Sequence, residues 1–299
     1  MSVPAAYLGI VIIWSTTPLA VQWSAEGVGF MFGITLRMGA GALLSLLLLT
    51  ALRVRLPWKA DSLRGYAAAA LGLYGGMTGV YWSAQYVPSG LISVMFGLTP
   101  LLAGLFSLLW LGERGLTPAR LAGMLISLGG LLVIFQADYS AYPQAWKGIA
   151  MLLLSVTVYA ASMVLVKRSG AELHPLAMST GSLLLATPCY LLTWLLLDGI
   201  AWPATVPART LLSIGYLAVF GSLIGFLLYF YALKHLSTAV MALVSLITPV
   251  LALQLGRLAN HESVPAKVWA GTAVVLAGLA LHQWGGRIRL RRRQKVLAA

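Results

Sequence analysis

The sequence predicts an all-α integral membrane protein whose ten transmembrane helices form two inverted five-helix repeats. Three observations predict this fold class. The 299 residues are 60% hydrophobic and only 9% charged, with a mean hydropathy of +0.89, whereas soluble domains average roughly 45–50% apolar and 25% charged residues. Apolar runs long enough to span a bilayer, which takes about 20 residues, follow one another along the chain. One of these runs returns 149 residues later.

Short charged or Pro- and Gly-marked connections separate the apolar runs. The expected spans are 4–23, 30–52, 65–84, 90–111, 119–136, 148–166, 175–197, 210–232, 238–257 and 267–285. The first run has no basic residue before it, unlike a secretory signal peptide, so we expect an uncleaved first span. The division predicts a first repeat over 4–136, a periplasmic connection over 137–147, a second repeat over 148–285 and a basic tail over 286–299.

The distribution of Lys and Arg predicts the orientation. With the N-terminus in the cytoplasm, fifteen of the twenty basic residues fall on the cytoplasmic side, four fall outside and Arg37 lies within a span. Both termini are therefore expected in the cytoplasm, on a multi-pass membrane protein. The tail RIRLRRRQK is expected to bind anionic lipid headgroups. This placement of charge favours the bilayer, and not nucleic acid, as the partner of the net charge of +13.

The stretch that repeats is a membrane helix with a proline at its centre. It runs from Leu91 to Glu113 and returns from Val240 to Glu262, so Thr99-Pro100 matches Thr248-Pro249. A proline inside a helix removes a backbone donor and crowds the preceding turn, so we expect both helices to be broken, with Pro100 and Pro249 as hinges. Broken helices at matching positions of two halves indicate the binding site of a transporter.

The number of spans in each half predicts how the halves are related. Each half contains five spans, so the second half enters the membrane with the opposite orientation. The repeat is therefore expected to be inverted, which is the arrangement used for alternating access around a site near the bilayer midplane.

These features together resemble the drug/metabolite transporter superfamily and, within it, the EamA-type exporters with ten helices. The resemblance is carried by the duplicated Thr-Pro, by Gly112-Glu113, Trp14 and Arg37, and by the Gly-rich ends of the repeats, Gly123 to Gly130 and Gly271 to Gly278. The second repeat departs from the pattern with Asn260-His261-Glu262 in place of Leu111-Gly112-Glu113. The resemblance implies export of amino acids or related metabolites from a bacterial cytoplasm across the inner membrane. It also implies a central cavity lined mainly by spans one, three, four, six, eight and nine.

Polar and aromatic side chains at helical spacing are the candidates for contact with substrate. In span three they share one stripe, while the glycines at 72, 75, 76 and 79 occupy other faces and permit close helix packing. The alternative interpretations are an aromatic belt at the membrane interface and contacts that only hold helices together. The candidates are Trp14, Thr17, Tyr74, Thr78, Tyr81, Trp82, Ser93, Thr99, Ser155, Tyr159, Ser162, Met163, Ser245 and Thr248.

Charged residues allow two interpretations each. Arg37 either attracts a substrate carboxylate or is structural, paired with Glu26 or with loop carbonyls or reaching toward the interface. Glu113 either has a structural role, fixing the inner turn or pairing with Arg114 or Arg120, or belongs to a gating ion pair on the cytoplasmic side. Glu262 is its counterpart in the second repeat. Thr117 and Pro118 are expected to cap and begin the following helix.

No acidic residue is expected at mid-membrane, which argues against a carboxylate relay for protons or sodium. The sequence also offers no catalytic carboxylate pair and no His or Cys cluster with metal-ligand spacing, so neither an enzyme nor a metal or cofactor is predicted. The predicted function is export of a small-molecule substrate by alternating access. Three alternatives remain open: a multidrug exporter of lipophilic cations, a nucleotide-sugar or sugar-phosphate transporter, and a membrane enzyme or structural subunit. The oligomeric state is not predicted.

Overall fold

The structure is a computed structural model that describes residues 2–113, 117–169, 172–200, 202–236 and 238–297, without the side chains of residues 226, 230, 233, 234, 238, 239, 242 and 285–297. Its elements are α1 (Val3–Ser24), α2 (Phe30–Ala51), α3 (Ala60–Leu71), η1 (Gly72–Gly76), α4 (Met77–Ser83), α5 (Ser89–Phe96), α6 (Thr99–Leu111), α7 (Pro118–Phe135), α8 (Ala145–Arg168), α9 (Pro175–Asp198), α10 (Ala208–Tyr216), η2 (Leu217–Ile224), α11 (Gly225–His235), α12 (Thr238–Asn260) and α13 (Ala266–Leu297). Arg114, the Lys234 side chain and the basic side chains of the tail lie outside the described part.

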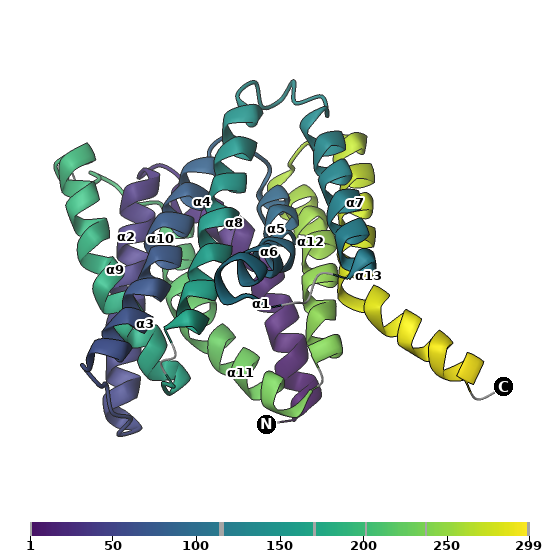
Figure 1. Ribbon diagram of the computed structural model, residues 1–299. Coiled ribbons are helices and arrows are strands. Elements are labelled where there is room, and N and C mark those ends of the chain that lie inside the picture. The colour runs from purple at the N-terminus through teal and green to yellow at the C-terminus, as the bar shows by residue number, and fades with distance from the viewer. Residues whose placement is uncertain (1, 114–116, 170–171, 201, 237, 298–299) are drawn as a thin grey trace.

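The helices join into ten rods, as the sequence predicts. Eight of them are long and apolar enough to cross a membrane, within the part of the chain that the structure describes. The other two are α3–η1–α4, which the π-helical segment η1 divides, and α13, which continues into the basic tail. Both chain ends lie at the same end of the bundle (Figure 1). We call this the termini end and the opposite one the far end.

Local sequence signals set the helix boundaries. Thr117 accepts a hydrogen bond from the Arg120 amide at 3.3 Å, and Pro118 begins α7, as predicted. Gly112 ends α6 with a φ of 65°, a left-handed conformation that glycine adopts without steric cost.

The two repeats meet symmetrically where α7 packs against α13 (Figure 1). A Cβ atom placed on Gly123 would lie 2.5 Å from the Gly278 carbonyl oxygen, and one placed on Gly278 would lie 2.5 Å from the Gly123 carbonyl oxygen. Gly130 and Gly271 are related in the same way at 2.7 Å. Small residues let two membrane helices approach this closely. The reciprocal contacts show the pseudo-twofold relation of an inverted repeat.

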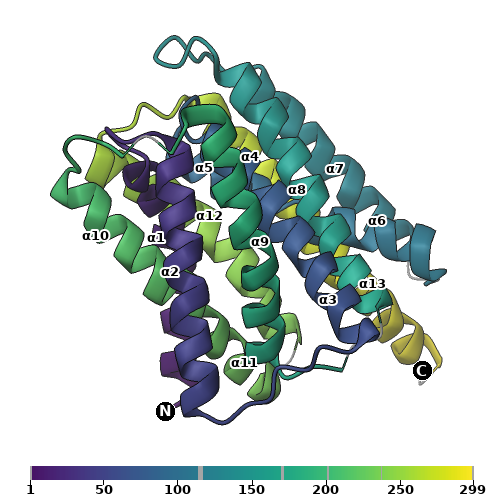
Figure 2. The ribbon, with the colours of Figure 1, turned by 90° about the vertical axis from the view of Figure 1, so that its left-hand side faces the viewer.

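Elsewhere each repeat packs against the first helices of the other. The rod α3–η1–α4 packs on α8, and the rod α10–η2–α11 packs on α1 (Figure 2). A Cβ on Gly76 would lie 3.4 Å from the Tyr159 side chain, and a Cβ on Gly225 would lie 3.5 Å from Trp14 Nε1. Gly76 and Gly225 are 149 residues apart, so these two contacts are also equivalent.

The two helices that carry the repeated Thr-Pro differ from each other. The first is broken as predicted: α5 ends at Phe96 and α6 begins at Thr99, with Pro100 in its first turn. The second prediction is wrong, because α12 continues without a break through Pro249. The repeat offset places Leu246 opposite Gly97. Glycine weakens a helix by about 1 kcal/mol relative to alanine, so the first helix carries a second breaking residue that the other lacks.

Candidate transport site

Arg37 lies on α2 with its side chain 5% exposed, and it is the one buried Lys or Arg among the described side chains. Its Nε donates to Ser222 Oγ at 3.4 Å, and Nη1 donates to the Tyr81 hydroxyl at 3.3 Å. The guanidinium carbon lies 5.9 Å from the centre of the Tyr81 ring. Since Ser222 belongs to η2, the arginine joins the first repeat to the second.

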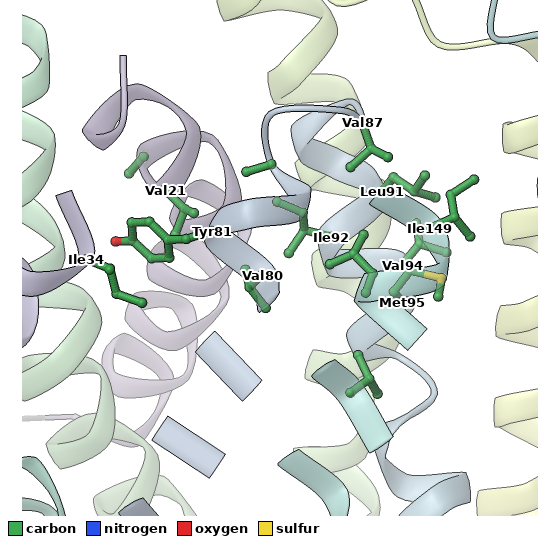
Figure 3. Close-up of a cluster of buried hydrophobic side chains, with 14 of the residues drawn as sticks. Val21, Ile34, Val80, Tyr81, Val87, Leu91, Ile92, Val94, Met95 and Ile149 are labelled. Carbon is green, nitrogen blue, oxygen red and sulfur yellow. The ribbon is translucent and has the colours of Figure 1, made fainter. Parts of the chain in front are cut away.

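Tyr81 is fully buried in the main hydrophobic cluster, close to Val21, Ile34 and Val80 (Figure 3). Its hydroxyl also accepts from Ser24 Oγ at 3.4 Å. A polar pair of arginine and phenol is therefore surrounded by apolar side chains, where electrostatic interactions are strong and an unpaired charge is costly.

A second group of hydroxyls, from η1, α4 and α9, surrounds the π-helical segment η1. The Tyr190 hydroxyl donates to the Leu73 carbonyl oxygen and its ring meets Tyr74 edge-on, with 5.1 Å between centroids. Tyr74 and Thr193 share a hydrogen bond of 2.6 Å, and Thr78 donates to the Tyr74 carbonyl at 2.5 Å. π-Helical segments leave backbone groups without regular partners and occur often at functional sites. The other such segment, η2, contains Gly221, the repeat counterpart of Gly72 in η1.

At the far end, a network of polar side chains joins the two repeats. Glu262 is 5% exposed, and its carboxylate accepts from the Ser89 amide at 2.9 Å and from Asn260 Nδ2 at 3.0 Å. Ser89 is the first residue of α5, so the carboxylate lies where the helix dipole and free amides favour a negative charge. Burial and then the charge of Glu262 raise the pKa of Tyr142, in the loop before α8, above its usual value.

Three further contacts extend this far-end network to α1. Asn260 Nδ2 donates to Gln22 Oε1 at 3.2 Å, and Trp23 Nε1 donates to Asn260 Oδ1 at 2.9 Å. Gln22 in turn donates to the Ala84 carbonyl at 3.2 Å. We define the far-end network as Gln22, Trp23, Ser89, Asn260 and Glu262.

The predicted pairing of Arg37 with Glu26 is wrong, and Glu113 has a partner that was not predicted. Glu26 forms an ion pair with Arg209, whose guanidinium carbon lies 5.2 Å from the centre of the Trp23 ring. It is therefore not the partner of Arg37. Glu113 pairs with Lys167 of α8 at 2.5 Å. The predicted Arg120 is not part of this ion pair, and Arg114 lies outside the described residues. Both pairs observed here connect the two repeats, which the spacing of charges in the sequence does not reveal.

Two of the predicted aromatic residues contact aromatic rings of other helices. Trp14 meets Tyr229 with 5.3 Å between ring centroids, and Tyr159 meets Phe96 at 5.4 Å. All four rings are partly buried. These pairs bring α1 to α11 and α8 to α5.

The remaining candidates lie in helix packing or near the surface. Ser155 donates to the Met151 carbonyl and Ser162 to the Ala68 carbonyl, each at 2.7 Å, on the face that packs against the glycines of α3–η1–α4. Thr17 donates to the Ile13 carbonyl, Trp82 meets Tyr86, and Met163 is 49% exposed. Ser93, Thr99 and Thr248 are buried and Ser245 is half-buried. Hydroxyl spacing along a helix does not distinguish packing from a cavity.

Sequence reasoning missed Tyr190, Ser222, Gln22 and Asn260 as members of these clusters. Two of them carried a signal. Asn260 stands where the first repeat has Leu111, and Gln22 is a polar residue near the end of an apolar span. The sequence gives no such signal for Tyr190 and Ser222, because each joins a polar cluster only through contact with a helix that is distant in the sequence.

An all-helical membrane bundle of two inverted repeats, with a buried cation and irregular helices at matched positions, has the architecture of a secondary transporter. The sequence matches the EamA-like transporter family over residues 3–136 and 146–282. The chain belongs to this family.

Several curated proteins are similar to the chain over most of its length. A "Probable terminal-alkyne amino-acid exporter" of Streptantibioticus cattleyicolor is 27% identical over 275 residues, covering 91% of this chain and 90% of that protein. The "Uncharacterized inner membrane transporter YedA" of Escherichia coli K12 is 27% identical, with 94% and 90% covered. A "Probable amino-acid metabolite efflux pump" of Salmonella typhimurium is 26% identical, with 68% and 70% covered. A solved crystal structure shares the fold with a TM-score of 0.66 and 23% identity, covering 97% and 98% of the two chains.

Proposed function

We propose that this protein exports amino acids or related small metabolites across a bacterial inner membrane by alternating access between its two repeats. The names of the relatives support the substrate class and the membrane. The distribution of basic residues supports termini in the cytoplasm, which places the far end on the periplasmic side.

The observation that carries the mechanism is the unequal state of two equivalent glutamates. Glu262 is buried and accepts from the backbone amide of Ser89. Glu113, its repeat counterpart, is half-exposed and pairs with Lys167. The two equivalent proline helices are also in unequal states, because α5–α6 is broken and α12 is continuous. An inverted-repeat transporter changes sides when its repeats exchange such unequal states.

The offset of 149 residues between the repeats predicts which contact forms after this exchange. Ser89 begins α5, and the residue 149 positions later is Thr238, which begins α12. In the opposite state, Glu113 accepts from the Thr238 amide and closes the termini end, while Glu262 leaves Ser89 and the far end opens. Hydrogen bonds to a charged group contribute about 1.5–3 kcal/mol. This is enough to balance two conformations that differ by a few kcal/mol.

The charge of the site discriminates among substrates. Of the described side chains, one buried arginine and no buried carboxylate lie beside the two π-helical segments. A lipophilic cation would be repelled by Arg37. A sugar phosphate or nucleotide sugar carries more negative charge than one guanidinium neutralises. A zwitterion with a single carboxylate fits this charge better.

Transport into liposomes that contain the purified protein tests the proposal. A panel of labelled amino acids is offered with and without a pH gradient, and empty liposomes give the background. We expect saturable flux of at least one amino acid, and flux without the gradient would agree with the lack of a mid-membrane carboxylate. Absence of saturable flux for the whole panel would overturn the proposed substrate class. Strict dependence on the gradient would overturn the uncoupled mechanism.

A further inference from the structure

Arg37 carries a buried positive charge that has no counter-charge among the described residues. Three ion pairs form among the described residues, and none includes Arg37. Two carboxylates of the bundle have other partners: Glu26 pairs with Arg209, and Glu262 accepts from the Ser89 amide. An arginine stays ionised at any physiological pH, and a charge within a membrane-spanning helix is costly unless it is paired or functional.

The partners that Arg37 does have are neutral and distant. Its bonds to Ser222 and Tyr81 measure 3.4 and 3.3 Å, compared with about 2.7–2.9 Å for a charge-assisted bond to an anion. A guanidinium has five N–H donors in a planar fork, and these contacts use two of them. The remaining donors can still bind both oxygens of one carboxylate.

The third guanidinium nitrogen, Nη2, lies against a glycine. A Cβ atom on Gly221 would lie 3.4 Å from Nη2, so a larger side chain there would cover this nitrogen. Gly221 belongs to the π-helical segment η2, whose irregular turn sets the approach of the backbone to α2. Tyr81 and Ser222 hold the other two nitrogens and fix the plane of the fork.

We propose that Arg37 binds the carboxylate of the transported substrate, with Tyr81 and Ser222 as the residues that position the guanidinium. The inference rests on the proposed function, because it assigns the substrate class of the same site. It identifies Arg37 as the residue that distinguishes acids from their neutral analogues. A free inorganic anion such as chloride offers the same charge, so the test separates the two sources.

The decisive measurement is selectivity between an acid and its amide. The labelled substrate is the amino acid with the largest flux in liposomes, and the competitors are the same amino acid and its primary carboxamide, both unlabelled. The measurement is made for the wild type and for three variants, Arg37→Gln, Arg37→Lys and Arg64→Gln. We expect Arg37→Gln to raise the KM for the acid about 10- to 100-fold, the worth of a hydrogen-bonded charge, and to abolish the preference for acid over amide. Arg37→Lys keeps the charge but loses the fork, so an intermediate preference is expected. Arg64 lies in an exposed pair with Asp61, so its variant should match the wild type.

Thermal unfolding in detergent separates binding from a structural role. Removal of an uncompensated buried charge should leave the Tm without ligand unchanged or higher, because functional sites often cost stability. Acetate, a minimal carboxylate, should raise the Tm of the wild type but not of Arg37→Gln, and acetamide should raise neither. If Arg37→Gln does not fold, Tyr81→Phe provides the same comparison with a smaller expected loss of selectivity.

Two results would overturn the inference. One is an unchanged ratio of acid to amide in folded Arg37→Gln, or in Tyr81→Phe where the first variant does not fold. The other is that chloride raises the Tm of the wild type but not of Arg37→Gln, while neither acetate nor the transported acid changes the Tm. Flux with an unchanged ratio contradicts only this inference. Absence of flux contradicts the proposed function, while the acetate measurement still tests Arg37.

Discussion

The carboxylate of Glu262, at the end of the second repeat, accepts a hydrogen bond of 2.9 Å from the backbone amide of Ser89, the first residue of a helix in the first repeat. The contact joins the two halves of an inverted-repeat transporter at the end opposite to both termini. Its counterpart, Glu113, makes no equivalent contact with α12 among the described residues and pairs with Lys167.

Glu262→Gln is expected to open the far end. The variant keeps the size of the side chain but removes its charge. Loss of the hydrogen bond to a charged carboxylate destabilises the closed state by about 1.5–3 kcal/mol, and this raises the open population about 10- to 100-fold. A membrane-impermeant maleimide measures this at Ser89→Cys, which keeps the backbone donor and replaces a buried hydroxyl without a partner among the described residues. Cys189 is exposed and is first replaced by alanine. Unchanged labelling would contradict a role of Glu262 in closure, and Asp61→Asn at the termini end serves as the control.

Glu113→Gln is expected to act in the opposite direction. In the described state, Glu113 loses only a half-exposed ion pair, which contributes about 0–1 kcal/mol. In the opposite state, it loses the proposed contact with the Thr238 amide, so labelling at Ser89→Cys should fall. The double variant with Glu262→Gln should label closer to the wild-type level than either single variant. Equal labelling of Glu113→Gln and the wild type would rule out the exchange of glutamates.

The glycines between α7 and α13 are expected to determine stability. Gly123→Ala and Gly278→Ala each place a methyl group 2.5 Å from a backbone oxygen, and overpacking of this kind costs about 1–3 kcal/mol. Gly129→Ala on the same helix meets nothing within 4 Å and should leave stability unchanged or raise it slightly. Thermal unfolding in detergent gives the comparison. Similar Tm values for Gly129→Ala and the two packing variants would mean that α7 and α13 can separate at little cost.

The two prolines are expected to affect transport more than folding. Pro249→Ala restores a donor to the unbroken helix α12 and should hold it continuous, which reduces flux by about tenfold or more if the helix must break during exchange. Pro100→Ala should reduce flux less, because Gly97 still weakens the first helix. Pro188→Ala in α9 is the matched control, since it changes a proline inside another membrane helix. Wild-type flux in folded Pro249→Ala would show that α12 does not move as a hinge.

Hydropathy, charge placement and repetition determined most of the fold from the sequence alone. A bilayer forces each apolar run into a helix because unpaired backbone groups are too costly there. The number of runs per repeat then fixes the inversion. The break before Pro100 also followed from the sequence, and the absence of one at Pro249 could have been anticipated from Leu246 in place of Gly97.

Only the tertiary structure decided which polar groups meet. Arg37 reaches Ser222 across 185 residues, Glu262 reaches Ser89 across 173, and Tyr190 meets η1 across 117. Helical periodicity shows which residues share a face, but it does not show which distant helix that face contacts. For this reason the sequence offered Glu26 as one possible partner of Arg37, whereas in the structure Glu26 pairs with Arg209 and Arg37 has no counter-charge among the described residues.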